Sequence, residues 1–182
     1  MEKERIILVG HAASGKDYAK ELLQNKLGLT YGVSYTSRPP RVGEIEGKDY
    51  FFRDENFFKE KIKEKAWYEY VIFNKWYYGT LKSQFYGKDN VFIMTPKGLA
   101  HLNGEDREKS LVIFFDIPED IRYERISKRK GNADSIDRRI EADKVDFMGF
   151  SNYDQTIKKP DFSIKDIKHI INIYSPNIKF YK

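Results

Sequence analysis

The stretch "RIILVGHAASGKDYAKELLQNKLG" (residues 5–28) decides the fold class. Its opening run is short, bulky and apolar and stops at Gly10, which is typical of a buried parallel strand. From Asp17 onward, apolar residues recur on one face and Gly28 provides a stop, so this segment predicts a helix. Between them, "GHAASGKD" (10–17) has the spacing of a phosphate-binding loop, G-x-x-x-x-G-K-[ST]. Strand, glycine loop and helix together predict nucleotide binding.

The residue types in this loop suit phosphate. Successive backbone N–H groups, together with the N-terminus of the following helix, would cradle the α- and β-phosphates. The two glycines allow a close approach that side chains would obstruct, and Lys16 would reach the β/γ oxygens. The predicted cofactor-binding residues are Gly10, Ala12, Ala13, Ser14, Gly15, Lys16 and Asp17.

The last position of the loop is unusual, because Asp17 stands where the pattern has a hydroxyl residue that ligates Mg²⁺. A carboxylate is a stronger Mg²⁺ ligand than a hydroxyl, and Mg²⁺ usually takes only one or two protein oxygens with several waters. The opposing effect is repulsion between an extra carboxylate and the β/γ-phosphates, unless a metal sits between them. Asp17 is therefore the predicted metal ligand, and a loop that binds without turnover is the alternative.

The rest of the chain extends this unit into an α/β architecture. Two apolar runs, 91–95 and 110–117, predict further central strands, each followed by a proline near a helix start. After Pro118 we expect two helices split by a mobile loop over 130–134, then a short strand "DFSI" (161–164) and a closing helix. The predicted fold is a P-loop NTPase-type parallel sheet flanked by helices, with a small mixed α/β insertion and a helical lid. The expected division is a core (about 1–31, 81–126 and 155–182), an insertion (about 32–80) and a lid (about 127–150).

The composition excludes several classes of protein. The chain has no cysteine, which excludes disulfides, thiolate zinc sites and cysteine nucleophiles. No apolar run approaches the ~20 residues needed to span a bilayer, and the N-terminal apolar stretch is too short for a signal peptide. We therefore expect a cytoplasmic protein. The net charge of +5 fits a nucleic-acid surface, basic side chains turned toward phosphorylated small molecules, or dispersed lysines on solvated faces.

A second basic segment is "TSRPPR" (Thr36–Arg41). Its consecutive prolines forbid a helix, so Arg38 and Arg41 lie on an extended arm. Such an arm can present two guanidinium groups to one phosphate. A solvated basic turn is the alternative for these residues.

Taken with these features, a wider resemblance becomes specific. The segment "SYTSRPPRVGEIEGKDYFF" (34–52) is similar to the signature of the guanylate kinases, P-loop enzymes that move the γ-phosphoryl group of ATP onto GMP. The segment "YYGT" (Tyr77–Thr80) resembles the second motif of that family, and Glu69 stands where the family has its guanine-reading carboxylate. The order of the phosphate loop and the arginine-bearing helices also matches. The resemblance therefore covers essentially the whole chain.

The resemblance implies an ATP:GMP phosphotransferase that requires ATP and Mg²⁺ and accepts GMP, with dGMP as a second expected acceptor. Guanine presents two neighbouring N–H donors, which a carboxylate accepts, and an O6 acceptor, to which a hydroxyl can donate. The implied catalytic residues are Lys16, Arg125, Arg129 and Arg139, although the three arginines also fit a solvated basic face. The implied phosphate-binding residues for GMP are Arg38, Arg41, Tyr50 and Tyr78, and the implied guanine-binding residues are Ser34, Glu69 and Thr80, with Gly79 beside them.

Besides Asp17, two further departures from the family pattern leave an alternative open. The family usually has an Asp-x-Asp pair after the strand that ends "VFIM", where this chain has Ile93, Met94 and Thr95. The asparagine that the family places near the ATP base has no clear counterpart around 158–160. The alternative is a catalytically weak or inactive guanylate-kinase-like binding module. We expect small-molecule partners, no nucleic acid, no membrane, and a monomer or homodimer.

Overall fold

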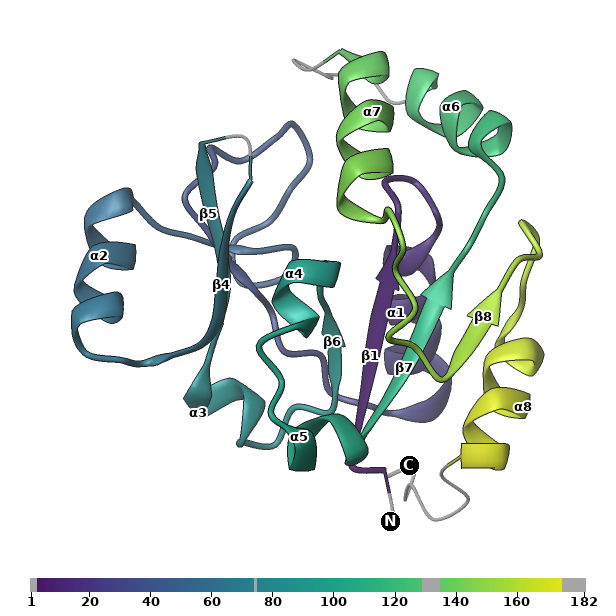
Figure 1. Cartoon of the computed structure of the whole chain (residues 1–182), viewed down its shortest axis with the longest axis horizontal. Helices are drawn as coiled ribbons and strands as arrows, with labels where there is room; N and C mark the ends of the chain where they lie inside the picture. The colour runs from purple at the N-terminus through teal and green to yellow at the C-terminus, as the bar shows by residue number, and fades with distance from the viewer. Residues whose placement is uncertain (1–2, 74, 129–134, 175–182) are drawn as a thin grey trace.

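The computed structural model describes residues 3–73, 75–128 and 135–174, which form two four-stranded sheets (Figure 1). The first sheet is parallel, with strand order β6-β1-β7-β8. The second sheet is mixed, with order β3-β2-β5-β4. The strands are β1 (Arg5–Gly10), β2 (Tyr35–Thr36), β3 (Phe51–Phe52), β4 (Trp67–Phe73), β5 (Trp76–Leu81), β6 (Val91–Ile93), β7 (Ser110–Phe115) and β8 (Gln155–Ile157). This arrangement confirms the predicted α/β fold class.

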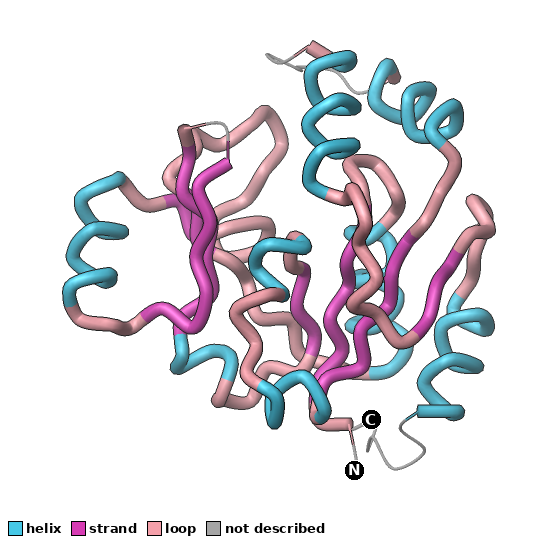
Figure 2. The backbone as a smooth tube through the Cα atoms, viewed as in Figure 1, coloured by secondary structure: helices cyan, strands magenta, loops and turns pink. Residues whose placement is uncertain are grey.

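Helices flank the parallel sheet, and one helix covers the mixed sheet (Figure 2). In this view α2 lies along the outer side of the mixed sheet, and α6 and α7 stand beyond the carboxyl ends of β1 and β7. The helices are α1 (Lys16–Leu27), α2 (Glu55–Lys63), α3 (Lys82–Phe85), α4 (Pro96–Leu99), α5 (Gly104–Glu108), α6 (Glu119–Ser127), α7 (Ile136–Asp146) and α8 (Ile164–Tyr174).

The parallel sheet is buried on both faces, as its continuous apolar strands require. Successive side chains of β1 point to opposite faces. Ile6 and Leu8 pack in one cluster with apolar residues of α1 and α8, whereas Ile7 and Val9 pack in the other with residues of α3, α4 and β6. All six residues of β1 pair in register with β7, from Arg5 opposite Ser110 to the strand end. The phosphate loop therefore follows a central strand that is paired on both edges.

Gly15 sets the geometry between the loop and α1. Its φ of 97° is in the left-handed region, which favours glycine. A Cβ at this position would also lie 2.9 Å from a ring carbon of Phe162, a buried residue just before α8. The loop can therefore pack closely against the segment before α8 only because position 15 has no side chain.

The mixed sheet has its own aromatic core. Trp67 of β4 is buried and stacks on Phe58 of α2, with ring centroids 4.6 Å apart and planes 12° apart. The indole N–H of Trp67 donates to the backbone carbonyl of Phe58 at 3.3 Å. This packing holds α2 against the sheet.

The base of β4 is joined to the main core through Tyr68. Its ring stacks on Phe85 of α3, with centroids 3.5 Å apart, and its hydroxyl donates to Asp106 Oδ2 at 2.8 Å. Phe85 belongs to the core cluster beneath β1. Strand β4 is therefore anchored to the main core at Tyr68, the residue next to Glu69.

Three of the predicted strands differ from the structure. The strand predicted over 91–95 ends at Ile93, because the Thr95 hydroxyl accepts the Gly98 N–H at 3.0 Å and caps α4. The strand predicted over 110–117 ends at Phe115. The strand predicted over 161–164 is wrong. Those residues lead into α8, where the Ser163 N–H donates to the Asp166 carboxylate at 2.7 Å, and the strand beside β7 is β8.

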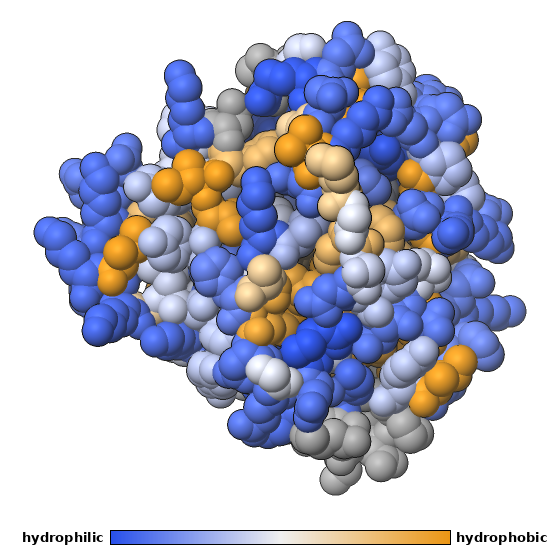
Figure 3. Space-filling model, viewed as in Figure 1, coloured by the Kyte–Doolittle hydropathy of each residue, from blue (hydrophilic) through white to orange (hydrophobic). Residues whose placement is uncertain are grey.

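The mobile loop predicted over 130–134, between α6 and α7, lies outside the described residues. Among the helices that are described, none is long and apolar enough to cross a membrane. The face seen in Figure 3 is mostly hydrophilic, with small separate groups of apolar residues.

Candidate active site

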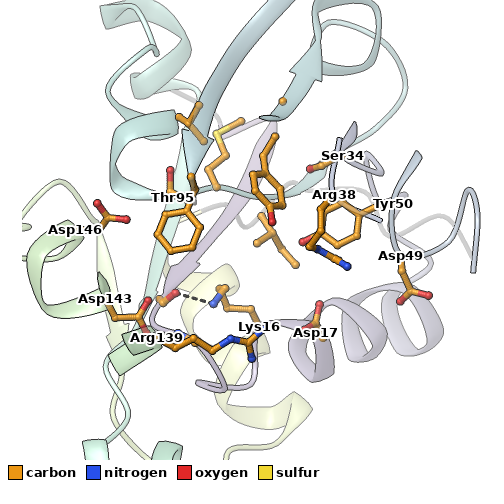
Figure 4. A pocket seen from close by; sticks show the side chains of 18 of the residues that line it. Lys16, Asp17, Ser34, Arg38, Asp49, Tyr50, Thr95, Arg139, Asp143 and Asp146 are labelled. Atoms are coloured by element: carbon orange, nitrogen blue, oxygen red, sulfur yellow. Dashed lines mark hydrogen bonds between the residues drawn. The ribbon is translucent and has the colours of Figure 1, made fainter. Parts of the chain in front are cut away.

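A cavity of about 350 Å³ lies between the phosphate loop, the mixed sheet and α7 (Figure 4). It brings together predicted residues that are far apart in the chain. The phosphate loop contributes Gly10, Ala12, Ala13, Lys16 and Asp17, the mixed-sheet region contributes Ser34, Arg38, Arg41, Tyr50, Glu69, Tyr78 and Gly79, and α7 contributes Arg139. Thr80 does not line this cavity itself, but its hydroxyl is hydrogen-bonded to Glu69, as described below.

The phosphate loop uses several of its polar groups internally. Lys16 Nζ donates to the carbonyls of Gly10 at 2.6 Å and His11 at 2.8 Å. Ser14 is fully buried, and its hydroxyl oxygen lies only 2.7 Å from where a Cβ on Gly10 would be. Burial, together with the nearby cations Arg122 and Lys16, lowers the pKa of His11 to about 4. The imidazole is therefore neutral at physiological pH and adds no charge to the loop.

The arginine arm is held by a carboxylate that the sequence reasoning did not single out. Arg38 Nη2 bonds to Glu44 Oε1 at 2.8 Å, and Glu44 Oε2 accepts the Arg41 N–H at 2.7 Å. Burial alone would lower the pKa of Arg38, but the hydrogen-bonded Glu44 outweighs it and the pKa is raised. The Arg38 guanidinium also lies 5.5 Å from the ring centroid of Tyr50. Glu44 thus holds the Arg38 guanidinium and the Arg41 backbone at the edge of the cavity.

Glu69 is a buried carboxylate facing the cavity, only 6% exposed. It pairs in register with Thr80 of β5, whose hydroxyl donates to Glu69 Oε1 at 2.8 Å. A bulge between Trp67 and Glu69 interrupts the register beside the carboxylate. Burial raises the pKa of Glu69 to about 7, against the opposing effect of the Thr80 hydrogen bonds. A carboxylate that is shielded from water in this way can accept hydrogen bonds from a ligand that carries N–H or O–H donors.

A second cavity, of about 690 Å³, opens on the other side of the same loop. Arg125 of α6 lines it and donates to the Ala13 carbonyl at 3.1 Å and the Pro160 carbonyl at 2.6 Å. Lys16 and Asp17 line both cavities. The structure therefore places Arg125 at a different cavity from the one that Glu69 and Arg139 line.

Arg129 lies outside the described residues. Seven acidic or aromatic residues line the first cavity without having been singled out from the sequence: Tyr31, Glu44, Asp49, Phe73, Asp143, Asp146 and Phe147. Of these, Glu44 carries a usable signal, a carboxylate three residues after Arg41 inside a proline-containing turn. The others carry no pattern that would assign them to the site.

The end of β6 is apolar where the family has its aspartate pair. Ile93, Met94 and Thr95 line the first cavity at that point. Among residues 3–73, 75–128 and 135–174, no group of three or more His, Cys, Asp or Glu side chains is arranged to hold a metal ion. The Asp17 carboxylate is 72% exposed and 3.8 Å from Lys20 Nζ. This donor set suits Mg²⁺, which commonly takes one or two protein oxygens and completes its shell with water and substrate phosphates.

The loop and the two cavities that meet at it define a P-loop nucleotide-binding protein of the phosphotransferase type. The guanylate kinase family model matches residues 2–174. The chain therefore belongs to the guanylate kinase family.

Individual relatives agree with this assignment. The guanylate kinase of Mycoplasma mobile is 53% identical over 81 residues, which are 43% of this chain and 40% of that protein. The guanylate kinase of Mycoplasma genitalium is 30% identical over 176 residues, covering 91% of this chain and 73% of that protein. The crystal structure of guanylate kinase from Anaplasma phagocytophilum has a TM-score of 0.72 at 20% identity, covering 98% of this chain and 89% of that one. That likeness bears on the fold alone.

Proposed function

We propose that the protein transfers the γ-phosphoryl group of ATP to GMP, giving ADP and GDP, with dGMP as a second acceptor. One observation carries the proposal. Lys16 and Asp17 line both the cavity that contains Glu69 and the cavity beside Arg125. Two nucleotides bound in these cavities would meet with their phosphates at the loop.

Phosphoryl transfer of this kind depends mainly on positioning and charge neutralisation. Lys16 would leave the Gly10 and His11 carbonyls and bind the β/γ oxygens of ATP. Arg125 would serve the donor phosphates from α6, together with Arg129. Arg139, which lines the acceptor cavity, would bridge to the transferred group.

The acceptor cavity has the chemistry that guanine and its phosphate require. Glu69 would accept the two guanine N–H donors, while Ser34 and Thr80 supply hydroxyl groups. Adenine would leave the buried Glu69 carboxylate without the two N–H donors that guanine supplies, a loss of ~1–3 kcal/mol. The GMP phosphate would be held by Arg38, Arg41, Tyr50 and Tyr78, beside Gly79.

Mg²⁺ belongs to the proposal, with Asp17 as its protein ligand. When bound, Mg²⁺ neutralises charge on the β- and γ-phosphates during transfer. The Asp17 side chain is exposed and lies next to Lys20 at the edge of both cavities, so it can turn toward a metal without disturbing the core. The division into core, insertion and lid belongs to the same proposal, as do a cytoplasmic location, the absence of nucleic-acid and membrane partners, and a monomeric or homodimeric state.

ADP release tests the proposal when ATP and Mg²⁺ are supplied with GMP, dGMP, AMP, CMP or UMP separately. We expect turnover confined to GMP and dGMP. A protein that binds GMP but turns over none of the five acceptors would instead be the binding module, with Asp17 and the apolar end of β6 as the cause.

A further inference from the structure

Asp143 of α7 places a carboxylate on the phosphate loop itself. The N–H of Ala12 donates to Asp143 Oδ2 at 2.6 Å, from a helix 131 residues further along the chain. Figure 4 shows Asp143 on one side of Lys16 and Arg139, with Arg38 and Tyr50 on the other. Backbone N–H groups of such a loop are the donors that bind phosphate.

The carboxylate of Asp143 is held on two sides. The same oxygen lies 3.4 Å from Nη1 of Arg122, whose side chain is buried and whose Nε donates to the Ile117 carbonyl at 3.0 Å. Burial raises the pKa of Asp143, while the Ala12 N–H, Lys16 and Arg122 act in the opposite direction. Asp143 is thus fixed in place by a rigid partner on α6 as well as by the loop.

A second group of the loop is also occupied by the chain's own acceptors. Lys16 Nζ, which would bind the donor phosphates, donates to the carbonyls of Gly10 and His11. The loop therefore pairs one of its backbone N–H groups with Asp143, and its lysine with backbone oxygens. Such partners remove the cost of leaving these donors unpaired.

We propose that Asp143 is an internal competitor for the donor phosphates: it accepts the Ala12 N–H and gives up this bond when ATP binds. This inference rests on the proposed function, because it takes the loop to be the donor site. A carboxylate oxygen and a phosphate oxygen are both anionic acceptors, so they repel each other at hydrogen-bond distance from one N–H. Donor affinity is therefore lower than the loop alone would give, and ATP binding releases α7 from the loop.

Other roles for Asp143 predict a different change in ATP affinity when its charge is removed. A magnesium ligand would add to ATP affinity when the metal is present, so its loss would weaken Mg²⁺-dependent binding. A purely structural carboxylate would change stability and leave ATP affinity unaltered. A competitor instead predicts tighter binding once its charge is removed.

The test is Asp143→Asn, which keeps the size of the side chain and an acceptor for Ala12 while removing the charge. The matched control is Asp146→Asn on the same helix, since Asp146 lines the same cavity but pairs with Lys97 Nζ at 2.6 Å. ATP binding is measured by isothermal titration calorimetry, in EDTA and in Mg²⁺. We expect Asp143→Asn to bind ATP about tenfold more tightly in EDTA, and Asp146→Asn to stay within about twofold of the unmodified protein. Unchanged or weaker binding by Asp143→Asn would overturn the proposal.

Two further measurements keep the outcomes separate. If the unmodified protein binds no ATP, the proposed function fails, whatever the variants do. If Asp143→Asn does not fold, pyrophosphate is titrated into the unmodified protein and amide resonances are followed by NMR. A shift of the Ala12 resonance together with those of Gly15 and Lys16 supports displacement of Asp143. Shifts of Gly15 and Lys16 that leave Ala12 unchanged would overturn it.

Discussion

Replacing Glu69 by glutamine probes the acceptor cavity, because it removes a buried charge and keeps the size of the side chain. Burial raises the pKa of Glu69 from 4.5 to about 7. A carboxyl whose pKa is higher in the folded state than in the unfolded state stabilises the fold most when it is protonated. Its contribution is complete below about pH 4.5 and is lost as pH rises through about 7.

The size of the effect follows from that shift. A rise from 4.5 to about 7 corresponds to ~3 kcal/mol of free energy of unfolding. Glutamine is neutral at every pH and does not incur this loss. Between pH 5 and pH 8, Glu69→Gln should therefore gain ~3 kcal/mol of stability relative to the unmodified protein. Glu69→Gln should bind GMP more weakly, because the guanine N–H donors need the ionised carboxylate. For the same reason, the GMP affinity of the unmodified protein should fall from pH 8 to pH 5.

Urea unfolding of both proteins at pH 5, 6, 7 and 8 measures the first effect, and calorimetric GMP titrations at the same pH values measure the second. Glu44→Gln is the control, because Arg38 holds the pKa of Glu44 below its usual range despite burial, so its charge stabilises the fold at neutral pH. Glu44→Gln should lose stability at pH 7. A stability difference between Glu69→Gln and the unmodified protein that does not change with pH would refute the reasoning. A GMP affinity of the unmodified protein that stays constant from pH 8 to pH 5 would also refute it.

Three further predictions concern the loop and its supports. Lys16→Ala should abolish ADP release while calorimetric GMP affinity stays unchanged, because Lys16 serves only the donor phosphates; an equal loss of GMP binding would contradict this assignment. Gly15→Ala should cost at least about 2 kcal/mol in thermal unfolding, from left-handed strain plus a contact of 2.9 Å with an aromatic ring. Gly43→Ala should cost only about 1 kcal/mol, because its φ is 88° but no atom lies within 4 Å, and equal losses would argue against the clash. Tyr68→Phe should cost ~1 kcal/mol in urea unfolding by removing the donor to Asp106, and no loss would mean that ring stacking alone fixes β4.

The parts of the fold that the sequence predicts are those with local signals. Strand β1, the loop and α1 follow from an apolar run, two glycines and a helical period, and all three form where expected. Strand β8 escaped prediction because "QTI" (155–157) has no strand pattern and is held by its pairing with β7. The apolar residues of "DFSI" look like a strand, but Phe162 is buried against the phosphate loop instead.

The site residues likewise divide into those with a local sequence signal and those without one. Residues inside motifs, such as Lys16, Arg38 and Glu69, come to one cavity as their spacing and family resemblance lead one to expect. Asp143 could not be predicted, because nothing in a helix sequence tells which polar side chain will meet a loop 131 residues away. Its contact depends on how α7 packs beside the loop, which is a property of the tertiary structure.

Both tryptophans of the chain belong to the mixed sheet, Trp67 in β4 and Trp76 in β5. Because the phosphate loop and the parallel sheet contain none, tryptophan fluorescence, excited selectively over that of tyrosine, arises from the Glu69 side of the molecule alone. Trp67 is buried against Phe58 and lies two residues from Glu69, so its emission is sensitive to changes next to the acceptor cavity. A stopped-flow trace with GMP would follow binding directly, whereas a trace with ATP alone would change only if the mixed sheet moves. The unlabelled protein thus contains its own optical reporter for the order of the two binding events.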